Sequence, residues 1–209
     1  MLFRSQAILF GVPQAQLFGP DEGRAFESHL QQVALLAAGL GARVCVLGAP
    51  RQRARGALGL AQALERARPI FRRLATHFHE AGVLLALEPA RPEYGGDFLT
   101  TTAEIAQYVR ELDRPGLGIQ LDAAALHSAG ESLATFLEDP ALRSWLAHVH
   151  ISEPGLGGYR GSQLPHADHL RRLREAGWTH GCSFELLRTQ AGPLPESGLA
   201  ELLAQLRQA

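Results

Sequence analysis

Short apolar segments alternate with longer amphipathic segments along the whole sequence, and this alternation limits the fold more than any other feature. The apolar segments that predict strands are Gln6–Gly11, Arg43–Gly48, Val83–Pro89, Leu117–Ala123, Ala147–Ser152 and Gly181–Leu187. The segments with helical periodicity are Arg24–Leu40, Ala57–Glu80, Thr102–Leu112, Ser132–Trp145, Ala167–Glu175 and Pro195–Gln208. Strands and helices that alternate in this way form βαβ units around a parallel sheet. We expect Pro69 to kink or split the second helix.

The six strand–helix units predict the α/β class and, more narrowly, a (β/α) TIM-type barrel. A complete barrel of this type has eight units and about 250 residues, whereas this sequence has 209 residues. We therefore expect a barrel that lacks the first two βα units, with a partial, open sheet as the alternative. No segment with the composition of a linker interrupts the sequence, so residues 1–209 are predicted to form one domain.

The charged residues exclude several classes of protein. All 20 basic residues are arginine, and without lysine the chain cannot be a Schiff-base aldolase, a pyridoxal-phosphate enzyme or a P-loop protein. A net charge of −1 offers nucleic acid no basic surface, so no nucleic-acid partner is expected. The apolar segments fall short of the roughly 20 residues that span a membrane. No signal-peptide pattern opens the sequence, so we expect a cytoplasmic location.

Polar side chains lie at or near the carboxyl ends of four consecutive predicted strands: Glu88, Asp122, His150 and Glu185. Because side chains alternate between the two faces of a strand, and the carboxyl ends of parallel strands meet at one edge, these four are expected to converge. Three carboxylates repel one another without a cation. Together with an imidazole they suit Mn²⁺, Mg²⁺ or Co²⁺, and Zn²⁺ is also compatible. His148 competes with His150 as the ligand, but it lies one layer deeper and is expected to be a buried, hydrogen-bonded residue.

The segments LALEP, GIQLDAAALHSAG, AHVHISEPG and HGCSFELL resemble the xylose isomerase-like TIM-barrel superfamily, which includes sugar isomerases, sugar epimerases and AP endonucleases. The segment RVCVLGAPRQR resembles a strand motif of its sugar phosphate isomerase/epimerase members. The resemblance implies that the four strand-end residues bind a divalent metal ion. It also implies that Glu88 and Glu185 act as an acid/base pair on a sugar or sugar phosphate.

Two positions depart from the pattern of that superfamily. Many relatives have a histidine three residues after the aspartate, where this chain has Ala125, and ketose epimerases have an arginine where this chain has Leu156. Arg160, in the same loop, is a candidate to replace that arginine in binding substrate. Arg53, in GAPRQR, and Glu153, in the loop after the histidine strand, are further candidates for substrate contacts. Each of them is also explained as a solvated loop residue.

Three functions follow from these observations. The first is a metal-dependent sugar or sugar-phosphate isomerase/epimerase. The second is a truncated, non-catalytic barrel that serves as a binding or scaffold subunit, whose unpaired sheet edges would favour a homodimer. The third is an AP endonuclease-like phosphodiesterase, which needs more histidine ligands and a basic surface. His166, Asp168 and His169 also have metal-binding side chains, but the start of a helix explains them better.

Overall fold

A computed structural model describes residues 4–5, 8–9, 11–162, 164–191 and 198–206. The chain divides into two units, which are described separately. Unit 1 comprises Met1–Gln120 and Trp145–Ala147, and unit 2 comprises Leu121–Ser144 and His148–Ala209. The prediction that residues 1–209 form one domain stays a prediction.

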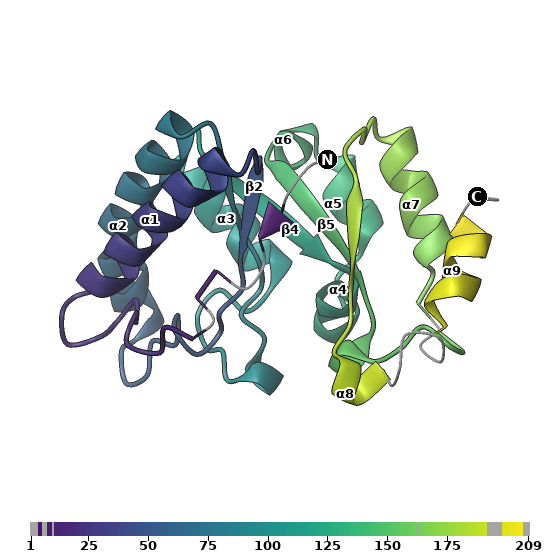
Figure 1. Ribbon diagram of the computed structural model, residues 1–209, viewed down its shortest axis with the longest axis horizontal. Helices are drawn as coiled ribbons and strands as arrows, with labels where there is room; N and C mark the ends of the chain where they lie inside the picture. The colour runs from purple at the N-terminus through teal and green to yellow at the C-terminus, as the bar shows by residue number, and fades with distance from the viewer. Residues whose placement is uncertain (1–3, 6–7, 10, 163, 192–197, 207–209) are drawn as a thin grey trace. The chain divides into compact units, whose positions relative to one another are not determined.

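Unit 1 consists of parallel strands connected by long helices. Its elements are β1 (Arg4–Ser5), α1 (Arg24–Gly39), β2 (Val44–Leu47), α2 (Leu60–Glu80), β3 (Leu84–Leu87), the 3-10 helix η1 (Pro92–Tyr94), α3 (Thr102–Leu112) and most of β4 (Leu117–Asp122). The strands pair in parallel in sequence order, from β1 to β4. Helices α1 and α2 lie next to each other (Figure 1), and α1 contacts β2 while α2 contacts β3. The predicted βαβ organisation is confirmed in this unit.

Aromatic rings form the centre of unit 1. Phe71 contacts both Phe26 and Tyr108 edge to face. The series continues from Tyr108 through Phe98 to Phe18, and the ring centroids of neighbouring pairs are 5.0 to 6.4 Å apart. Rings packed in this geometry stabilise a core beyond the effect of their buried area. The helices therefore hold the strands of unit 1 through a continuous apolar interior.

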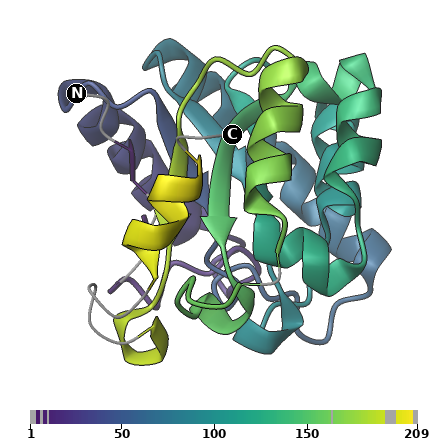
Figure 2. The same cartoon turned by 90° about the vertical axis from the view of Figure 1, so that its right-hand side faces the viewer.

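Unit 2 contains shorter α-helices than unit 1. Its elements are the end of β4, α4 (Ala123–Ala129), α5 (Leu133–Glu138), α6 (Pro140–Ser144), most of β5 (Leu146–Ser152), the 3-10 helix η2 (Pro154–Leu156), α7 (His166–Glu175), β6 (Cys182–Glu185), α8 (Arg188–Ala191) and α9 (Leu199–Leu206). Strands β5 and β6 pair in parallel, with Ser152 opposite Glu185. Helices α7 and α9 cover one face of these strands (Figure 2), where Leu170 and Leu202 pack with Ile151.

The first predicted strand, Gln6–Gly11, is wrong in its described part. Ile8 and Leu9 are buried in a turn, and the strand lies earlier, at Arg4–Ser5. Side chains satisfy the carbonyls of that turn, because His29 Nε2 lies 2.6 Å from Ile8 O and Gln52 donates to Leu9 O. An apolar turn of this kind looks like a strand in the sequence. Residues 6, 7 and 10 lie outside the described part of the chain.

The helix predicted over Ser132–Trp145 is two helices, α5 and α6. They separate at Asp139, which has an extended backbone, because a proline at the next position disfavours the helical conformation in the residue before it. Helix α4 was not predicted. Pro69, in contrast, does not split α2. It is exposed, and so is Glu65, whose carbonyl would have accepted the missing N–H bond and is left near solvent.

The last predicted helix, Pro195–Gln208, lies partly outside the described residues. Within them it is observed as α9. None of the helices in the described ranges combines the length and the apolar character of a membrane-spanning helix.

Candidate metal centre

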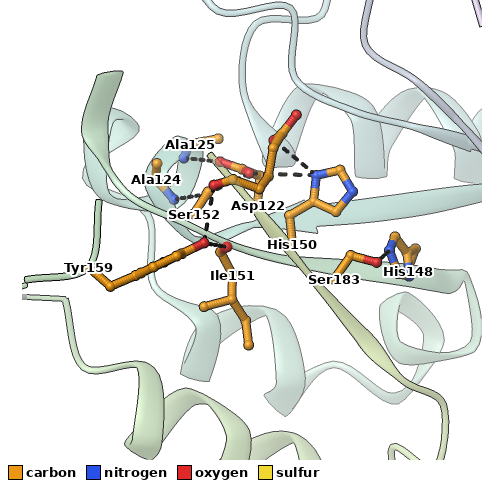
Figure 3. Close-up of polar contacts among 10 residues, drawn as sticks. Asp122, Ala124, Ala125, His148, His150, Ile151, Ser152, Tyr159 and Ser183 are labelled. Carbon is orange, nitrogen blue, oxygen red and sulfur yellow. Dashed lines mark hydrogen bonds and ion pairs between the residues drawn. The ribbon is translucent and has the colours of Figure 1, made fainter. Parts of the chain in front are cut away.

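Asp122 ends β4 and caps α4, and its carboxylate is buried and held on both oxygens. Oδ1 accepts a hydrogen bond from the Ala125 backbone N–H at 2.7 Å, and Oδ2 accepts one from the Ser152 hydroxyl at 2.6 Å. The Ser152 oxygen in turn accepts the Ala124 N–H at 3.0 Å. Figure 3 shows this chain of contacts between the end of β4, the start of α4 and the end of β5. The orientation of the carboxylate is therefore fixed by the protein itself.

His150 lies between two carboxylates of unit 2. Its Nδ1 is 3.2 Å from Glu185 Oε2 and 3.8 Å from Asp122 Oδ2, and the ring is turned toward Asp122 in Figure 3. His150 is buried, whereas the Glu185 side chain keeps 27% of its exposure. One ligand atom from each of Asp122, His150 and Glu185 lies within 4.8 Å of the others. The structure brings these three predicted ligands together.

The spacing of these atoms fits a divalent metal ion. Around an ion with bonds of about 2.1 Å, neighbouring ligand atoms of an octahedral shell are about 3.0 Å apart and opposite ones about 4.2 Å. The observed separations from His150 Nδ1, 3.2 Å to Glu185 and 3.8 Å to Asp122, fall between these limits. Two carboxylates and an imidazole are also a donor set that Mn²⁺, Co²⁺ and Zn²⁺ accept. The cluster is therefore a candidate metal site.

His148 is buried as expected, on the same face of β5 as His150. Its Nε2 lies 3.0 Å from the Ser183 hydroxyl, and the two imidazole rings are 5.1 Å apart and nearly perpendicular (Figure 3). The sequence prediction that His148 is a buried, hydrogen-bonded residue is confirmed.

Glu88 follows β3 in unit 1, and two residues of the β2–α2 connection adjoin it. Arg53 is fully buried and donates from Nη2 to the Glu88 backbone carbonyl at 2.6 Å. Its Nε and Nη1 make no hydrogen bond with the described residues, and burial lowers the pKa of this guanidinium to about 10, although Glu88 opposes the shift. A Cβ on Gly48 would stand 2.5 Å from Glu88 Oε2, so glycine leaves room for this carboxylate. That Glu88 is a fourth ligand stays a prediction.

The other two predicted substrate contacts occupy different surroundings in unit 2. The Glu153 carboxylate is buried, accepts the Ser162 hydroxyl and lies 2.5 Å from His166 Nε2. The Arg160 side chain is 67% exposed and lies 3.8 Å from Glu201. Their contacts with a substrate stay predictions.

The sequence reasoning missed two residues that shape the site. Ser152 is a polar residue at the end of a predicted strand, and its bond to Asp122 joins residues 30 positions apart, which neighbouring residues do not indicate. Tyr159 sits in a glycine-rich loop with no motif around it, yet its buried hydroxyl lies 2.6 Å from Ile151 O and 3.1 Å from Glu185 O. Asp168 does not cap a helix but bonds the exposed Arg171 and Arg172.

Comparison with known proteins matches the chain over residues 9–209 to the family described as "Xylose isomerase-like TIM barrel". No match is found among curated proteins. Among solved structures, 3-keto-D-glucoside 4-epimerase from E. coli is 19% identical with a TM-score of 0.78, over 94% of this chain and 76% of that one. L-ribulose 3-epimerase is 16% identical with a TM-score of 0.76, over 94% and 72%. An AP endonuclease of family 2 from Brucella melitensis is 18% identical with a TM-score of 0.75, over 91% and 71%.

The chain belongs to the xylose isomerase-like TIM barrel family. Its structure is an α/β TIM-barrel fragment, which confirms the predicted fold class. At these identities the similarity to solved structures supports the fold, and the reactions named above are those of the neighbours.

Proposed function

We propose that the protein is a divalent-metal-dependent isomerase or epimerase that acts on a sugar or sugar phosphate. The observation that carries the proposal is the Asp122–His150–Glu185 cluster at the strand ends of unit 2, in which Asp122 and His150 are buried. Membership of the family and structural neighbours that include two epimerases support the sugar as substrate class. Mn²⁺, Mg²⁺ or Co²⁺ is the expected ion, and Zn²⁺ is the alternative.

Asp122, His150 and Glu185 would hold the ion, with Glu88 as the fourth ligand. Support for Glu88 comes from its position after β3, one βα unit before Asp122, and from the space that Gly48 leaves for its carboxylate. A divalent ion held there would polarise the carbonyl and the adjacent hydroxyl oxygen of a hydroxy-ketone, which would make the hydrogen on the carbon between them more acidic.

Glu88 and Glu185 would move the proton. One carboxylate takes the proton from that carbon, and the C–H electron pair forms an enediolate. The other glutamate, in its acid form, returns a proton to the same carbon from the opposite face, which inverts the configuration. Exchange with water then restores both starting protonation states. If the proton were delivered to the former carbonyl carbon, the reaction would be an isomerisation. Arg53, Glu153 and Arg160 remain the proposed substrate contacts.

Metal content is the first test. We expect purified protein, reconstituted with Mn²⁺, to hold about one ion per chain, and Glu185→Gln to hold markedly less, since an amide is a weaker ligand than a carboxylate. Elemental analysis measures the ion in both. The matched control is Glu175→Gln, an exposed glutamate on α7 that pairs with Arg171 and should leave the metal content unchanged.

Proton transfer is tested next, with a panel of ketoses and ketose phosphates in D2O. Incorporation of deuterium at the carbon beside the carbonyl, followed by NMR, reports proton transfer whichever product forms. Glu185→Gln should lower the exchange rate by about 10²- to 10⁴-fold. If the wild type binds no ion after reconstitution, the proposal fails and a binding or scaffold role replaces it.

A further inference from the structure

The hydroxyl of Tyr159 lies where β5 and β6 end. It is within hydrogen-bonding distance of two backbone carbonyls, 2.6 Å from Ile151 O and 3.1 Å from Glu185 O. Ile151 directly follows His150 in β5, and Glu185 is the last residue of β6. Neighbouring parallel strands are separated by the ladder spacing, so one donor reaching both carbonyls links the backbone beside one metal ligand to the backbone of another.

Packing fixes the Tyr159 ring in this position. The side chain is buried, and its ring meets the rings of Phe184 and His166 edge to face, with centroids 5.7 and 5.9 Å away. Leu202 of α9 belongs to the same apolar cluster. The hydroxyl is therefore delivered to the strand ends by a ring that has little freedom to move.

Buried polar contacts fix the loop that carries Tyr159. Glu153, at its start, accepts the hydroxyl of Ser162, and its Oε1 lies 2.5 Å from Nε2 of His166, where α7 begins. Glu153 and His166 are 7% and 2% exposed. Glu153 precedes Tyr159 in the chain, whereas Ser162 and His166 follow it. The Glu153 carboxylate therefore joins the two ends of the loop. The loop thus has the anchors that a rigid support needs.

We propose that Tyr159 is a positioning residue of the metal site, which ties the ends of β5 and β6 together so that His150 and Glu185 keep the spacing an ion requires. The inference rests on the proposed metal function. Residues that orient metal ligands through hydrogen bonds change metal affinity when they are lost, although they never touch the ion. The Tyr159 hydroxyl has the position for this role, since it reaches the backbone of both strands at their carboxyl ends.

Tyr159→Phe tests the proposal, because it removes the hydroxyl and keeps the ring. Calorimetric titration of the metal-free protein with Mn²⁺ should give a Kd about 10- to 100-fold higher than in the wild type. The absorption spectrum of the Co²⁺ form, which reports ligand geometry, should change as well. The thermal midpoint of the metal-free variant should stay close to that of the control.

The matched control is Tyr108→Phe. Tyr108 is as buried as Tyr159, lies on α3 of unit 1 and has no hydrogen-bond partner for its hydroxyl among the described residues. The Tyr108→Phe variant also loses one buried hydroxyl, and its Mn²⁺ affinity and Co²⁺ spectrum should match those of the wild type. Equal affinity in Tyr159→Phe and the wild type would overturn the role of Tyr159.

The two proposals fail in different ways. If the wild-type protein binds no ion, the proposed function is contradicted. If the wild type binds Mn²⁺ but with the same affinity as Tyr159→Phe, only the positioning role is contradicted. Should Tyr159→Phe not fold, Ser162→Ala decides. This variant loosens the loop anchor at Glu153, so a smaller loss of Mn²⁺ affinity supports the proposal and an unchanged affinity overturns it.

Discussion

In unit 1, the long helices α1 and α2 enclose a series of aromatic rings, whereas in unit 2 shorter helices enclose carboxylates and imidazoles. The fully enclosed side chains of unit 1 include Phe26, Phe71 and Phe98. Those of unit 2 include Asp122, His148, His150, Ser152 and His166, each at most 2% exposed.

The apolar interior of unit 1 and the polar interior of unit 2 affect stability in different ways. Apolar burial stabilises a fold in proportion to its area, whereas buried polar groups cost free energy unless each finds a partner. Unit 2 offsets that cost with hydrogen bonds among its buried groups, such as those of Asp122 with Ser152 and Ala125. The aromatic interior of unit 1 thus contributes chiefly stability, whereas the polar interior of unit 2 holds three of the four proposed ligands.

The largest expected effect comes from the aromatic interior of unit 1. Phe71→Ala removes a fully buried ring that contacts Phe26 and Tyr108, and should lower the free energy of unfolding by about 3–5 kcal/mol. Urea denaturation of the metal-free protein measures it. Leu35→Ala, at a side chain that is 65% exposed, should change the same quantity by less than about 0.5 kcal/mol. A loss at Phe71 no larger than at Leu35 would contradict this view of unit 1.

The next effect concerns metal-dependent stability in unit 2. Mn²⁺ at 100 times its Kd should raise the free energy of unfolding of the wild type by about 2.7 kcal/mol. Asp122→Ala should abolish this increase, since it removes a proposed ligand. The measurement is urea denaturation with and without Mn²⁺.

A second helix cap separates the loss of a ligand from the loss of a cap. Asp139 also accepts backbone N–H bonds, from Ala141 at 2.8 Å and Leu142 at 3.3 Å. Asp139→Ala should cost about 0.5–2 kcal/mol without metal and should keep the full Mn²⁺ increase. If Asp122→Ala keeps the increase too, the carboxylate is only a cap and the metal site is elsewhere.

The smallest effect is a dependence on pH in unit 2. Burial lowers the pKa of His169 below its ordinary value of 6.5, and the neighbouring His166 lowers it further. As pH falls, the unfolded chain therefore binds the proton at a higher pH than the folded protein does. The contribution of His169 to the free energy of unfolding is complete above pH 6.5 and decreases progressively below it. His169→Gln should lose less stability than the wild type between pH 7 and 5 in urea denaturation. His127→Gln, at an exposed position, should follow the wild-type curve, and identical curves for all three would refute the assignment.

Local signals in the sequence were sufficient for much of the fold. The helix over Thr102–Leu112 has the predicted bounds, because Thr101 and Glu104 form a capping box whose pattern is readable in the sequence. Asp122, His150 and Glu185 were found from strand ends and side-chain parity, which depend only on neighbouring residues. The alternation of strands and helices indicated the fold class for the same reason.

The features that were missed depend on contacts between distant segments. Ile8 and Leu9 read as a strand because nothing near them shows that His29 and Gln52 satisfy their carbonyls. The Tyr159 hydroxyl lies within hydrogen-bonding distance of Glu185 O, 26 residues further along the chain, and no periodicity in the sequence predicts such a contact. Whether Arg53, Glu153 and Arg160 contact a substrate is likewise beyond sequence patterns.

Gly48 has no side chain, and the Glu88 carboxylate lies next to the place that a Cβ would occupy. Because a single added methyl group would stand 2.5 Å from the Glu88 Oε2, even the smallest replacement would push that carboxylate aside. The requirements of the proposed site thus extend to Gly48, which carries no reactive atom. A redesign that preserved every acid, base and ligand but exchanged this glycine for alanine would still displace Glu88.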